Sequence, residues 1–417
     1  MYAEEADCFS LLEWPEEARR CTAAMHNDDT MRPTLTYILP DKMGGVFTYV
    51  RNLLRYRGAG PFAVQAILTH NRRDVEERPA DSLPVDREVH FHYDPRENLY
   101  AVIKRLRRQL PPGPGVIVTN DWLELAMLSV HDPGKMVVNI THGDYPYYYD
   151  LAKRHEGVVD WFVAPSRYIA DRLREVMPHR CESILYLPHG VTIPKAMRSG
   201  TPGRLRAIFV GRLDTSKGIF DLPEIDRRLR ARNVEVEWSV VGNGPEGGRL
   251  RELWAWNSSV RWQGNLPNDE VMDLYRAHDV FVLPSRAEGF PITVVEAAAA
   301  GVVPIVSDLR SGIPEIVIDG STGFRASFDN PDAFASAVER LHHDRLLLDK
   351  MSTAARRQVA ENYDLERNVK HYDSLYERFT TGAQAFRPRC GLQYGSRLDR
   401  PWIPNLLVRA IRGVRNR

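Results

Sequence analysis

Cysteine is scarce in this chain of 417 residues, which contains only Cys8, Cys21, Cys181 and Cys390. The four lie far apart, and no two of them have the C-x-x-C spacing of zinc or redox sites. So few cysteines exclude a disulfide scaffold. We therefore expect reduced thiols in a cytoplasmic protein.

Long apolar runs are also missing. The chain has no apolar run of about 18 residues, the length that a membrane-spanning helix needs. Its first residues, MYAEEADCFSLLEWPEEARR, begin acidic and lack the basic and apolar regions of a signal peptide. The sequence therefore predicts neither export nor a membrane span.

The chain has almost no excess charge. Lys and Arg number 56 against 55 Asp and Glu, for a net charge of +1, which argues against a dedicated nucleic-acid-binding protein. With 43% apolar and 27% charged residues the composition is globular. The length fits two or three ordinary domains.

Short apolar runs alternate with amphipathic stretches from Thr34 onward, in two series on either side of a segment rich in Pro, Gly and Ser at 194–203. This alternation is typical of βα units, in which helices cover both faces of a parallel sheet. Beyond residue 331 only helical patterns follow. We predict an α/β fold with two Rossmann-like, doubly wound domains that face each other, and C-terminal helices.

The same patterns predict how the chain is divided. We expect an acidic extension at 1–30, an N-terminal domain at 31–194, a C-terminal domain at 203–364, a helix at 365–380 that crosses back to the N-terminal domain, and a basic amphipathic tail at 381–417. In open α/β sheets, ligands bind beyond the carboxyl ends of the strands. Two facing sheets therefore predict a ligand site between the domains, built by residues at strand ends.

A glycine-rich segment at 242–247, GNGPEG, follows the strand pattern VEWSVV. It has the G-x-G-x-x-G pattern of dinucleotide sites, which makes an NAD-dependent oxidoreductase one alternative function. That function needs an acidic residue at the end of the next strand to bind the ribose, and the stretch VRWQGN has none. We interpret Gly244 as part of a tight turn beside a different ligand.

Gly44 and Gly45 lie between the first strand and the first helix of the N-terminal domain. Without β-carbons, their amides could approach an anion at the helix start. A turn that only needs a positive φ explains the two glycines equally well.

Arg212 and Lys217 follow the first strand of the C-terminal domain, in the segment GRLDTSKG. An Arg at a strand end and a Lys at a helix start can converge on one diphosphate. Such a pair is more often a surface feature, but its place at the carboxyl edge of a sheet favours binding.

Glu288 and Glu296 stand eight residues apart, the first in a turn after the strand VFVLP and the second inside a helix that starts at Pro291. The same spacing occurs at Glu5 and Glu13, so spacing alone proves little. In this context, however, a carboxylate can accept two hydrogen bonds from a vicinal diol, and the amides of the helix start can meet phosphate or sugar oxygens.

Taken together, these motifs resemble those of the retaining glycosyltransferases of family 4, which have the GT-B fold. The resemblance rests on the E-x(7)-E segment, the GRLDTSK and VVGNGP loops, the amino-terminal GGV, and the THGD and PHGV segments. It covers roughly residues 34 to 380.

The resemblance implies a donor site for a nucleotide diphosphate sugar. Glu296 would bind the ribose, Glu288 would contact the transferred sugar, and Arg212 and Lys217 would neutralise the departing diphosphate. The resemblance further places five residues around the donor: Gly264 and Leu266 near the base, and the amides of Gly289, Phe290 and Ile292 beside Glu288.

Two polar residues of the N-terminal domain also end strands. In similar enzymes a histidine at the position of His142, after the strand KMVVNIT, meets the donor sugar, although a lone histidine there is more often a satisfied polar residue. Asp121 is a weaker acceptor-side candidate, and a helix N-cap is its expected role.

We predict no metal and no cofactor. The chain contains no D-x-D, the motif on which metal-using glycosyltransferases of the other main fold generally rely, and its histidines lack ligand spacing. The predicted reaction moves a hexose from a nucleotide diphosphate sugar to a hydroxyl of a saccharide or lipid-linked saccharide, with retention of anomeric configuration as the family implies. By analogy with similar enzymes, the setting is bacterial surface polysaccharide biosynthesis.

Other functions remain as alternatives to this one. A nucleotide-sugar epimerase or another GT-B enzyme would need acid and base residues that the sequence does not identify. A binding protein without activity would keep Arg212, Lys217 and Glu296 but would not need Glu288 and His142 in position.

The two ends of the chain carry opposite charge. Residues 400–417 contain five Arg and no acid, and from Asn405 onward apolar residues recur at helical spacing. This pattern predicts either peripheral contact of a cytoplasmic protein with the anionic inner face of the membrane or a final helix docked on its own domain. The acidic residues 1–30 could also cover the basic tail.

Overall fold

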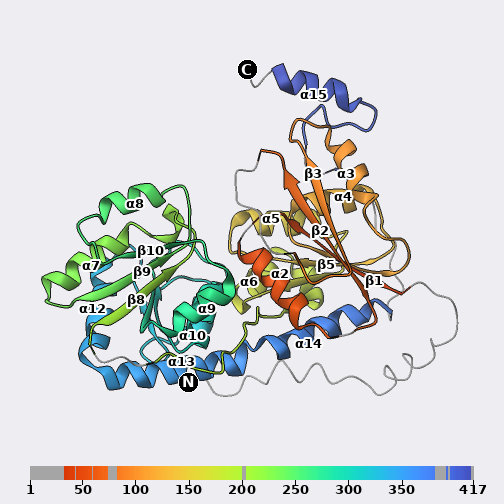
Figure 1. Ribbon diagram of the computed structural model, residues 1–417. Helices are drawn as coiled ribbons and strands as arrows, with labels where there is room; N and C mark the ends of the chain where they lie inside the picture. The colour runs from red at the N-terminus through yellow and green to blue at the C-terminus, as the bar shows by residue number, and fades with distance from the viewer. Residues whose placement is uncertain are drawn as a thin grey trace, which may run out of the picture.

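The computed structural model describes residues 32–42, 44–58, 60–73, 82–199, 203–380, 391–392 and 395–414. Two parallel sheets, each with helices on its faces, form two domains that lie side by side (Figure 1). This architecture confirms the predicted α/β fold with two doubly wound domains. The acidic extension and Cys8, Cys21 and Cys390 lie outside the described residues.

The first sheet has the strand order β3-β2-β1-β4-β5-β6-β7, and all its neighbouring strands are parallel. Its central strands, such as TLTYILP at β1 and GVIVT at β4, are buried almost throughout, as expected when helices cover both faces. The strands are β1 (Thr34–Pro40), β2 (Ala63–Asn71), β3 (Arg87–Tyr93), β4 (Gly115–Thr119), β5 (Met136–Ile140), β6 (Trp161–Ala164) and β7 (Ile184–Tyr186). The helices are α2 (Gly45–Tyr56), α3 (Leu99–Arg107), α4 (Trp122–Val130), α5 (Pro146–Arg154), α6 (Arg167–Val176) and the 3-10 helix η3 (Pro178–Ser183).

The second sheet has the order β10-β9-β8-β11-β12-β13 and is also parallel. Its strands are β8 (Leu205–Val210), β9 (Val236–Val241), β10 (Arg261–Gly264), β11 (Val280–Leu283), β12 (Val303–Ser307) and β13 (Phe324–Ala326). Its helices are η4 (Thr215–Lys217), α7 (Asp221–Ala231), α8 (Gly247–Leu253), α9 (Asn268–Arg276), α10 (Ile292–Ala299), α11 (Ile313–Ile316), α12 (Pro331–His343) and α13 (Arg345–Asn362).

The strand order reverses between β1 and β4 in the first sheet and between β8 and β11 in the second. At such a switch point the two following loops leave in opposite directions, which opens space for a ligand beyond the carboxyl ends of the strands. The predicted site residues lie in segments at or after the ends of β1, β5, β8, β9, β10 and β11. The fold thus directs them to these edges.

Two chain segments connect the domains at one point. Val191, in the segment after β7, pairs with Asp364: its amide donates to the carbonyl of Tyr363 (2.9 Å), and its carbonyl accepts from the amide of Leu365 (3.1 Å). A Cβ on Gly190 would lie 2.5 Å from the Cα of Leu365, so only glycine allows this approach.

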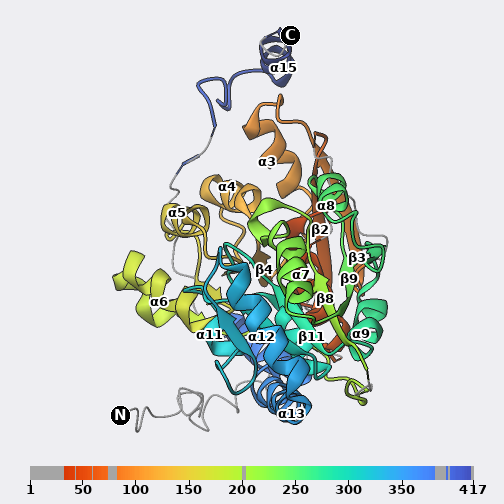
Figure 2. The ribbon, with the colours of Figure 1, turned by 90° about the vertical axis from the view of Figure 1, so that its left-hand side faces the viewer.

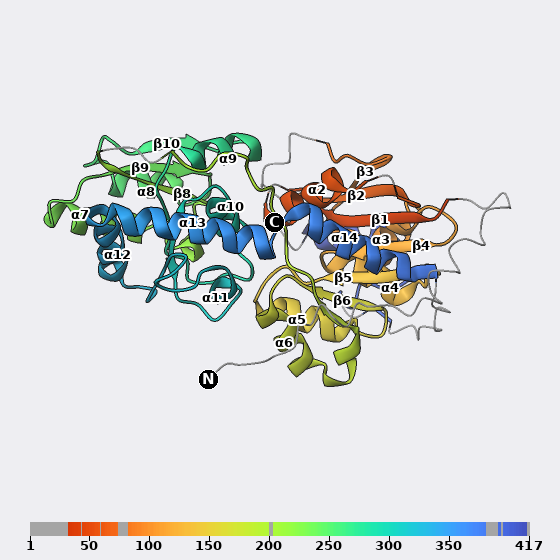
Figure 3. The same ribbon diagram turned by 90° about the horizontal axis from the view of Figure 1, so that it is seen from below.

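The chain then returns to the first domain as α14 (Leu365–Tyr376), followed by the 3-10 helix η5 (Glu377–Thr380). Seen from below, α13 runs along the second domain and α14 continues beneath the first (Figure 3). Tyr376 and Tyr37 of β1 share a hydrogen bond between hydroxyls (3.0 Å), and Tyr372 donates to the carbonyl of Leu187 (3.0 Å). These buried tyrosines attach α14 to the first domain.

The last described helix is α15 (Asn405–Val414). Figures 1 and 2 both show it beyond α3, at the outer end of the first domain and away from the second. Across the described ranges, no helix combines the length and the apolar character that crossing a membrane would require.

Candidate active site

Lys217 and Glu288 form an ion pair that joins the loops after β8 and β11. The Nζ of Lys217 donates to Oε1 of Glu288 at 2.7 Å, and the Ser285 hydroxyl donates to the same oxygen at 2.6 Å. Glu288 is buried. Burial lowers the pKa of Lys217, but the Glu288 carboxylate outweighs this effect, and the net shift is upward. The lysine therefore keeps its charge at the edge of the sheet.

The loop after β8 holds Lys217 through its own backbone. Asp214 caps the 3-10 turn by accepting hydrogen bonds from the amides of Ser216 (2.9 Å) and Lys217 (3.3 Å). Gly218 ends the turn with φ 65°, and a Cβ there would lie 1.8 Å from the Pro284 carbonyl oxygen. The segment TSKG is thus pressed against the start of the loop that carries Glu288.

Arg212 lies in the same loop, and 57% of its side chain is exposed. Its Nε lies 3.4 Å from Oδ2 of Asp214. An exposed guanidinium in the same loop as Lys217 is accessible to an anionic ligand in solution.

Glu296 lies in α10 and is 4% exposed. Burial raises its pKa to about 7, although the hydrogen bond from the Asn268 amide (2.7 Å) and the charge of Arg51 both lower it. The carboxyl group can accept hydrogen bonds from two adjacent hydroxyls once it is ionised. Because α10 follows the loop of Glu288, the two glutamates belong to one side of the second domain.

His142 follows β5 in the first domain. Its Nε2 lies 2.7 Å from Oδ1 of Asn120, and the Asn120 amide donates to the carbonyl of Ile38 (2.8 Å), which fixes that oxygen toward the ring. Nε2 therefore carries the proton and Nδ1 is left as an acceptor. Burial lowers the pKa of His142 to about 3, so the ring is neutral at physiological pH and can accept a hydrogen bond from a sugar hydroxyl.

An aromatic cluster connects His142 to the second domain. His189, from the PHGV segment, is at its centre. The centroid of its ring lies 3.7 Å from the ring centroid of Tyr49, 5.7 Å from that of His142 and 5.4 Å from that of Phe290. Burial lowers the pKa of His189 well below its ordinary value, and the nearby His142 adds to this shift. The cluster is uncharged and packs the two domains together next to the ion pair.

The backbones of the two domains meet at Gly143 and Gly289. A Cβ on Gly289 would lie 2.7 Å from the Cα of Gly143 and 2.9 Å from the amide nitrogen of Asp144. The Gly289 carbonyl also accepts from the amide of Gly312 (2.8 Å). Gly289 is therefore a contact point of the domains, and this contact brings the THGD segment close to Glu288.

The glycine-rich loop packs against the loop of Arg212 and Lys217. A Cβ on Gly242, at φ 122°, would lie 2.0 Å from the carbonyl oxygen of Gly211, and one on Gly244 would lie 2.4 Å from that of Leu213. The glycines thus allow two backbones to touch, which accounts for the pattern without a dinucleotide. The next strand ends at Gly264, again with no carboxylate for a ribose.

The remaining predicted donor residues lie at helix starts and strand ends. Gly44 precedes α2 and Gly45 begins it, and both are exposed. Ile292 begins α10 and is buried, while Leu266 is half-buried after β10. Their contacts with a donor stay predictions.

Sequence reasoning missed the tyrosines after β5. Tyr145 and Tyr147 are 40% and 44% exposed, and the Tyr147 hydroxyl donates to Asp121 (2.6 Å). The Tyr145 ring packs against Gly143, where a Cβ would lie 3.0 Å from it, and Gly143 is the residue that meets Gly289 of the second domain. Burial raises the pKa of Tyr145. The run YPYYY directly after THGD was the available signal.

Asp121 also has the structural role predicted for it. Its side chain accepts from the amide of Trp122 (2.8 Å), and Glu124 completes a capping box at the start of α4. Within the described ranges, no three His, Cys, Asp or Glu side chains gather as metal ligands do.

Solved structures with the same two-domain arrangement define the class as GT-B. The sucrose-phosphate synthase of Thermosynechococcus elongatus aligns with a TM-score of 0.70 at 19% identity, covering 84% of this chain and 100% of that one. HepE of Anabaena, solved with UDP and glucose, aligns with a TM-score of 0.67 at 15% identity, covering 83% and 99%. At these identities the likeness concerns the fold alone.

The sequence comparisons place the chain in a family. Residues 43–193 match the family described as Glycosyltransferase Family 4, and residues 198–358 match Glycosyl transferases group 1. The chain belongs to these glycosyltransferases, as the motifs predicted.

Individual relatives match over different lengths. The putative colanic acid biosynthesis glycosyltransferase WcaL of Salmonella typhimurium is 32% identical over 185 residues, which span 42% of this chain and 45% of that protein. The glycogen synthase of Mycobacterium tuberculosis is 25% identical over 308 residues, 69% of this chain and 74% of that protein.

The raised pKa of Glu296 predicts how stability depends on pH. In the unfolded chain this carboxyl group ionises near its ordinary pKa of 4.5, but in the folded protein only near pH 7. The unfolded state therefore binds fewer protons between these values, and stability falls as pH rises through this window. The unfolding free energy of the wild type should therefore fall between pH 5 and pH 8. Glu296→Gln removes the titrating group, so its unfolding free energy should fall by about 2–3 kcal/mol less over the same range.

Urea denaturation of both proteins at the two pH values measures this difference. Glu270→Gln, at an exposed position of α9, is the matched control and should follow the wild type. Parallel pH dependence in the Glu296 variant and the wild type would contradict the raised pKa.

Proposed function

We propose that this glycosyltransferase moves a hexose from a nucleoside diphosphate sugar to a hydroxyl of a saccharide or lipid-linked saccharide, with retention of anomeric configuration and without a metal ion. The observation that carries the proposal is the Lys217–Glu288 ion pair, with Arg212 beside it and Gly143 packed against Gly289. Two cations and a buried carboxylate at one sheet edge fit a diphosphate joined to a sugar.

The charges suggest how the donor is bound. A diphosphate that enters beside Arg212 competes with Glu288 for Lys217, since both are anions. Lys217 then contacts phosphate, and Glu288 is free to accept hydrogen bonds from sugar hydroxyls. Glu296 accepts the ribose hydroxyls in its ionised form.

The reaction breaks the bond between the anomeric carbon and a phosphate oxygen. Negative charge develops on the leaving diphosphate, where Arg212 and Lys217 stabilise it. The acceptor oxygen attacks from the face that the phosphate leaves, and its proton passes to the departing phosphate oxygen. Such same-face attack retains the configuration without a carboxylate nucleophile beneath the sugar.

The exposed tyrosines supply an acceptor site in this proposal. Tyr145 packs against Gly143 at the contact with Gly289, and the Tyr147 hydroxyl donates to Asp121 at the end of the neighbouring β4. Aromatic faces pack on the apolar faces of sugar rings, while the hydroxyls bind sugar oxygens. Both tyrosines belong to the first domain, whereas the proposed phosphate-binding residues Arg212 and Lys217 belong to the second.

The proposed setting is surface polysaccharide biosynthesis in bacteria, with the protein in the cytoplasm and in peripheral contact with the inner face of the membrane. The name of the Salmonella relative, which refers to colanic acid biosynthesis, supports the pathway class. The HepE structure with UDP and glucose supports a nucleotide-sugar donor.

Donor hydrolysis across a panel of UDP-, GDP- and ADP-hexoses tests this function. We expect one donor to release its nucleoside diphosphate and free sugar, at a rate within about twofold in the presence of EDTA, because two fixed cations replace the metal. Conversion to an epimeric nucleotide sugar without release would identify an epimerase instead. Loss of activity in EDTA that Mg²⁺ restores would overturn metal independence.

Arg212→Ala should lower kcat by ~10²-fold or more, the scale for losing one preorganised charge at a developing anion. Arg204→Ala is the matched control, because Arg204 is exposed at the opposite end of the same strand and pairs with Glu235. The control should keep wild-type kcat. Wild-type kcat in the Arg212 variant would remove this residue from the site.

Tyr145→Ala should raise the KM for the acceptor about tenfold and leave donor hydrolysis within about twofold, since it removes one stacking surface. Trp256→Ala, an exposed aromatic residue of the second domain, is the control. Steady-state kinetics with varied acceptor make the measurement. An equal effect on donor hydrolysis would place Tyr145 in the donor site.

A further inference from the structure

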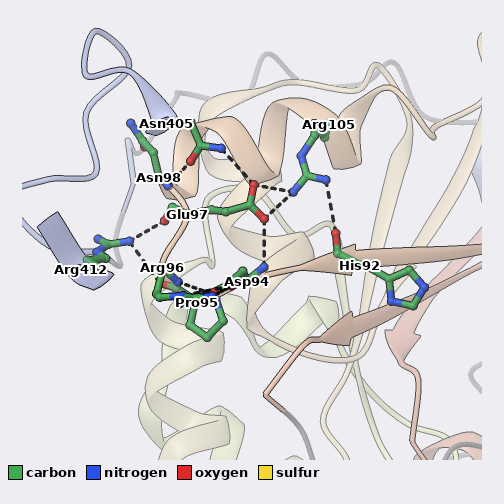
Figure 4. Close-up of polar contacts among 9 residues, drawn as sticks. All are labelled: His92, Asp94, Pro95, Arg96, Glu97, Asn98, Arg105, Asn405 and Arg412. Carbon is green, nitrogen blue, oxygen red and sulfur yellow. Dashed lines mark hydrogen bonds and ion pairs between the residues drawn. The ribbon is translucent and has the colours of Figure 1, made fainter. Parts of the chain in front are cut away.

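The helix α15 is attached to the first domain through its polar side. Asn405 accepts from the amide of Asn98 (2.8 Å), and its own amide donates to Glu97 (3.1 Å), as Figure 4 shows. One turn later Val408 is fully buried, and Arg412 donates to the carbonyl of Glu97. Residues at positions i, i+3 and i+7 thus form the docked face.

The segment before the helix makes the attachment firm. Asp399 is buried, accepts from the amide of Leu99 (2.7 Å) and pairs with Arg412 (2.6 Å). The side-chain amide of Asn98 donates to the carbonyls of Arg400 (2.8 Å) and Ile403 (2.7 Å). The helix is therefore fixed in orientation relative to the start of α3.

The opposite side of α15 is apolar and faces solvent. Leu406 is 80% exposed, Leu407 52% and Ile411 38%, and Trp402 just before the helix is 74% exposed. A helix on the surface of a globular domain ordinarily buries its apolar stripe and exposes its polar one. In α15 the polar side is docked and the apolar side is exposed. Exposed apolar surface of this kind marks a contact with another molecule.

The charges around the apolar residues indicate the partner. Arg397, Arg400 and Arg409 are exposed, whereas Asp399, the only acid of residues 395–414, is buried in its pair with Arg412. A second copy of the chain on this face would bring the same arginines against one another, because a twofold contact joins identical patches. An anionic lipid surface accepts the arginines at its headgroups, the leucines below them, and Trp402 at the boundary.

We propose that Trp402, Leu406, Leu407 and Ile411 form a rigid surface that inserts into anionic membranes and fixes the first domain against the lipid. This proposal deepens the proposed function. It rests on that function in one respect: if the acceptor is lipid-linked, membrane binding holds the first domain near its substrate. Figures 1 and 2 show α15 at the first domain and apart from the second domain.

Co-sedimentation of the full chain with vesicles tests the surface. The wild type should sediment with phosphatidylcholine vesicles that contain about one-third phosphatidylglycerol, and less so in pure phosphatidylcholine or at high salt. The variant with both Leu406→Glu and Leu407→Glu should partition on the order of 10²-fold more weakly. The control with Leu346→Glu and Leu253→Glu carries the same charge change at exposed leucines of the second domain and should bind like the wild type.

Donor hydrolysis and analytical ultracentrifugation separate the outcomes. The rate of donor hydrolysis should be unchanged in both double variants. Donor hydrolysis therefore tests the proposed activity, and co-sedimentation tests lipid binding separately. The membrane surface is rejected if the wild type does not sediment with anionic vesicles, or if the Leu406 and Leu407 variant sediments equally. A wild-type dimer that this variant converts to a monomer would assign the face to a second copy instead.

Discussion

The two domains meet backbone to backbone at Gly143 and Gly289, and the candidate site depends on that contact. A side chain on Gly289 would clash with the Gly143 Cα. Because the glycines allow this approach, THGD from the first domain lies beside the loop of Glu288 from the second. The two segments that connect the domains also pack closely, since a Cβ on Gly190 would lie 2.5 Å from the Cα of Leu365.

Charge is unevenly distributed over this contact. The second domain contributes Lys217, Glu288 and the exposed Arg212, while the facing histidines of the first domain and the linker are neutral. A neutral histidine does not compete for the anions of a donor, and it can still bind a hydroxyl. The division fits a site in which the second domain binds the phosphates and the first domain binds sugar.

The sequence predicted most of the fold and part of the site, and the differences have physical causes. Long buried strands such as TLTYILP show clear apolar runs, whereas β13, with three residues, is too short to form a pattern. Tyr145 and Tyr147 were missed because tyrosines at a helix start more often pack in a core. For α15 the sequence left two alternatives, and the structure contains features of both: a docked helix with an exposed apolar side.

The sequence by itself determined the α/β class, the strand-end segments and the family, because local periodicity and motif spacing are properties of neighbouring residues. The tertiary structure decided which segments meet. The Lys217–Glu288 pair joins residues that stand far apart in the chain. The side of α15 that docks is determined by hydrogen bonds of Asn98 and Asp399, and the apolar stripe of the helix stays exposed. Such contacts depend on how two sheets and a returning helix pack, which no local pattern encodes.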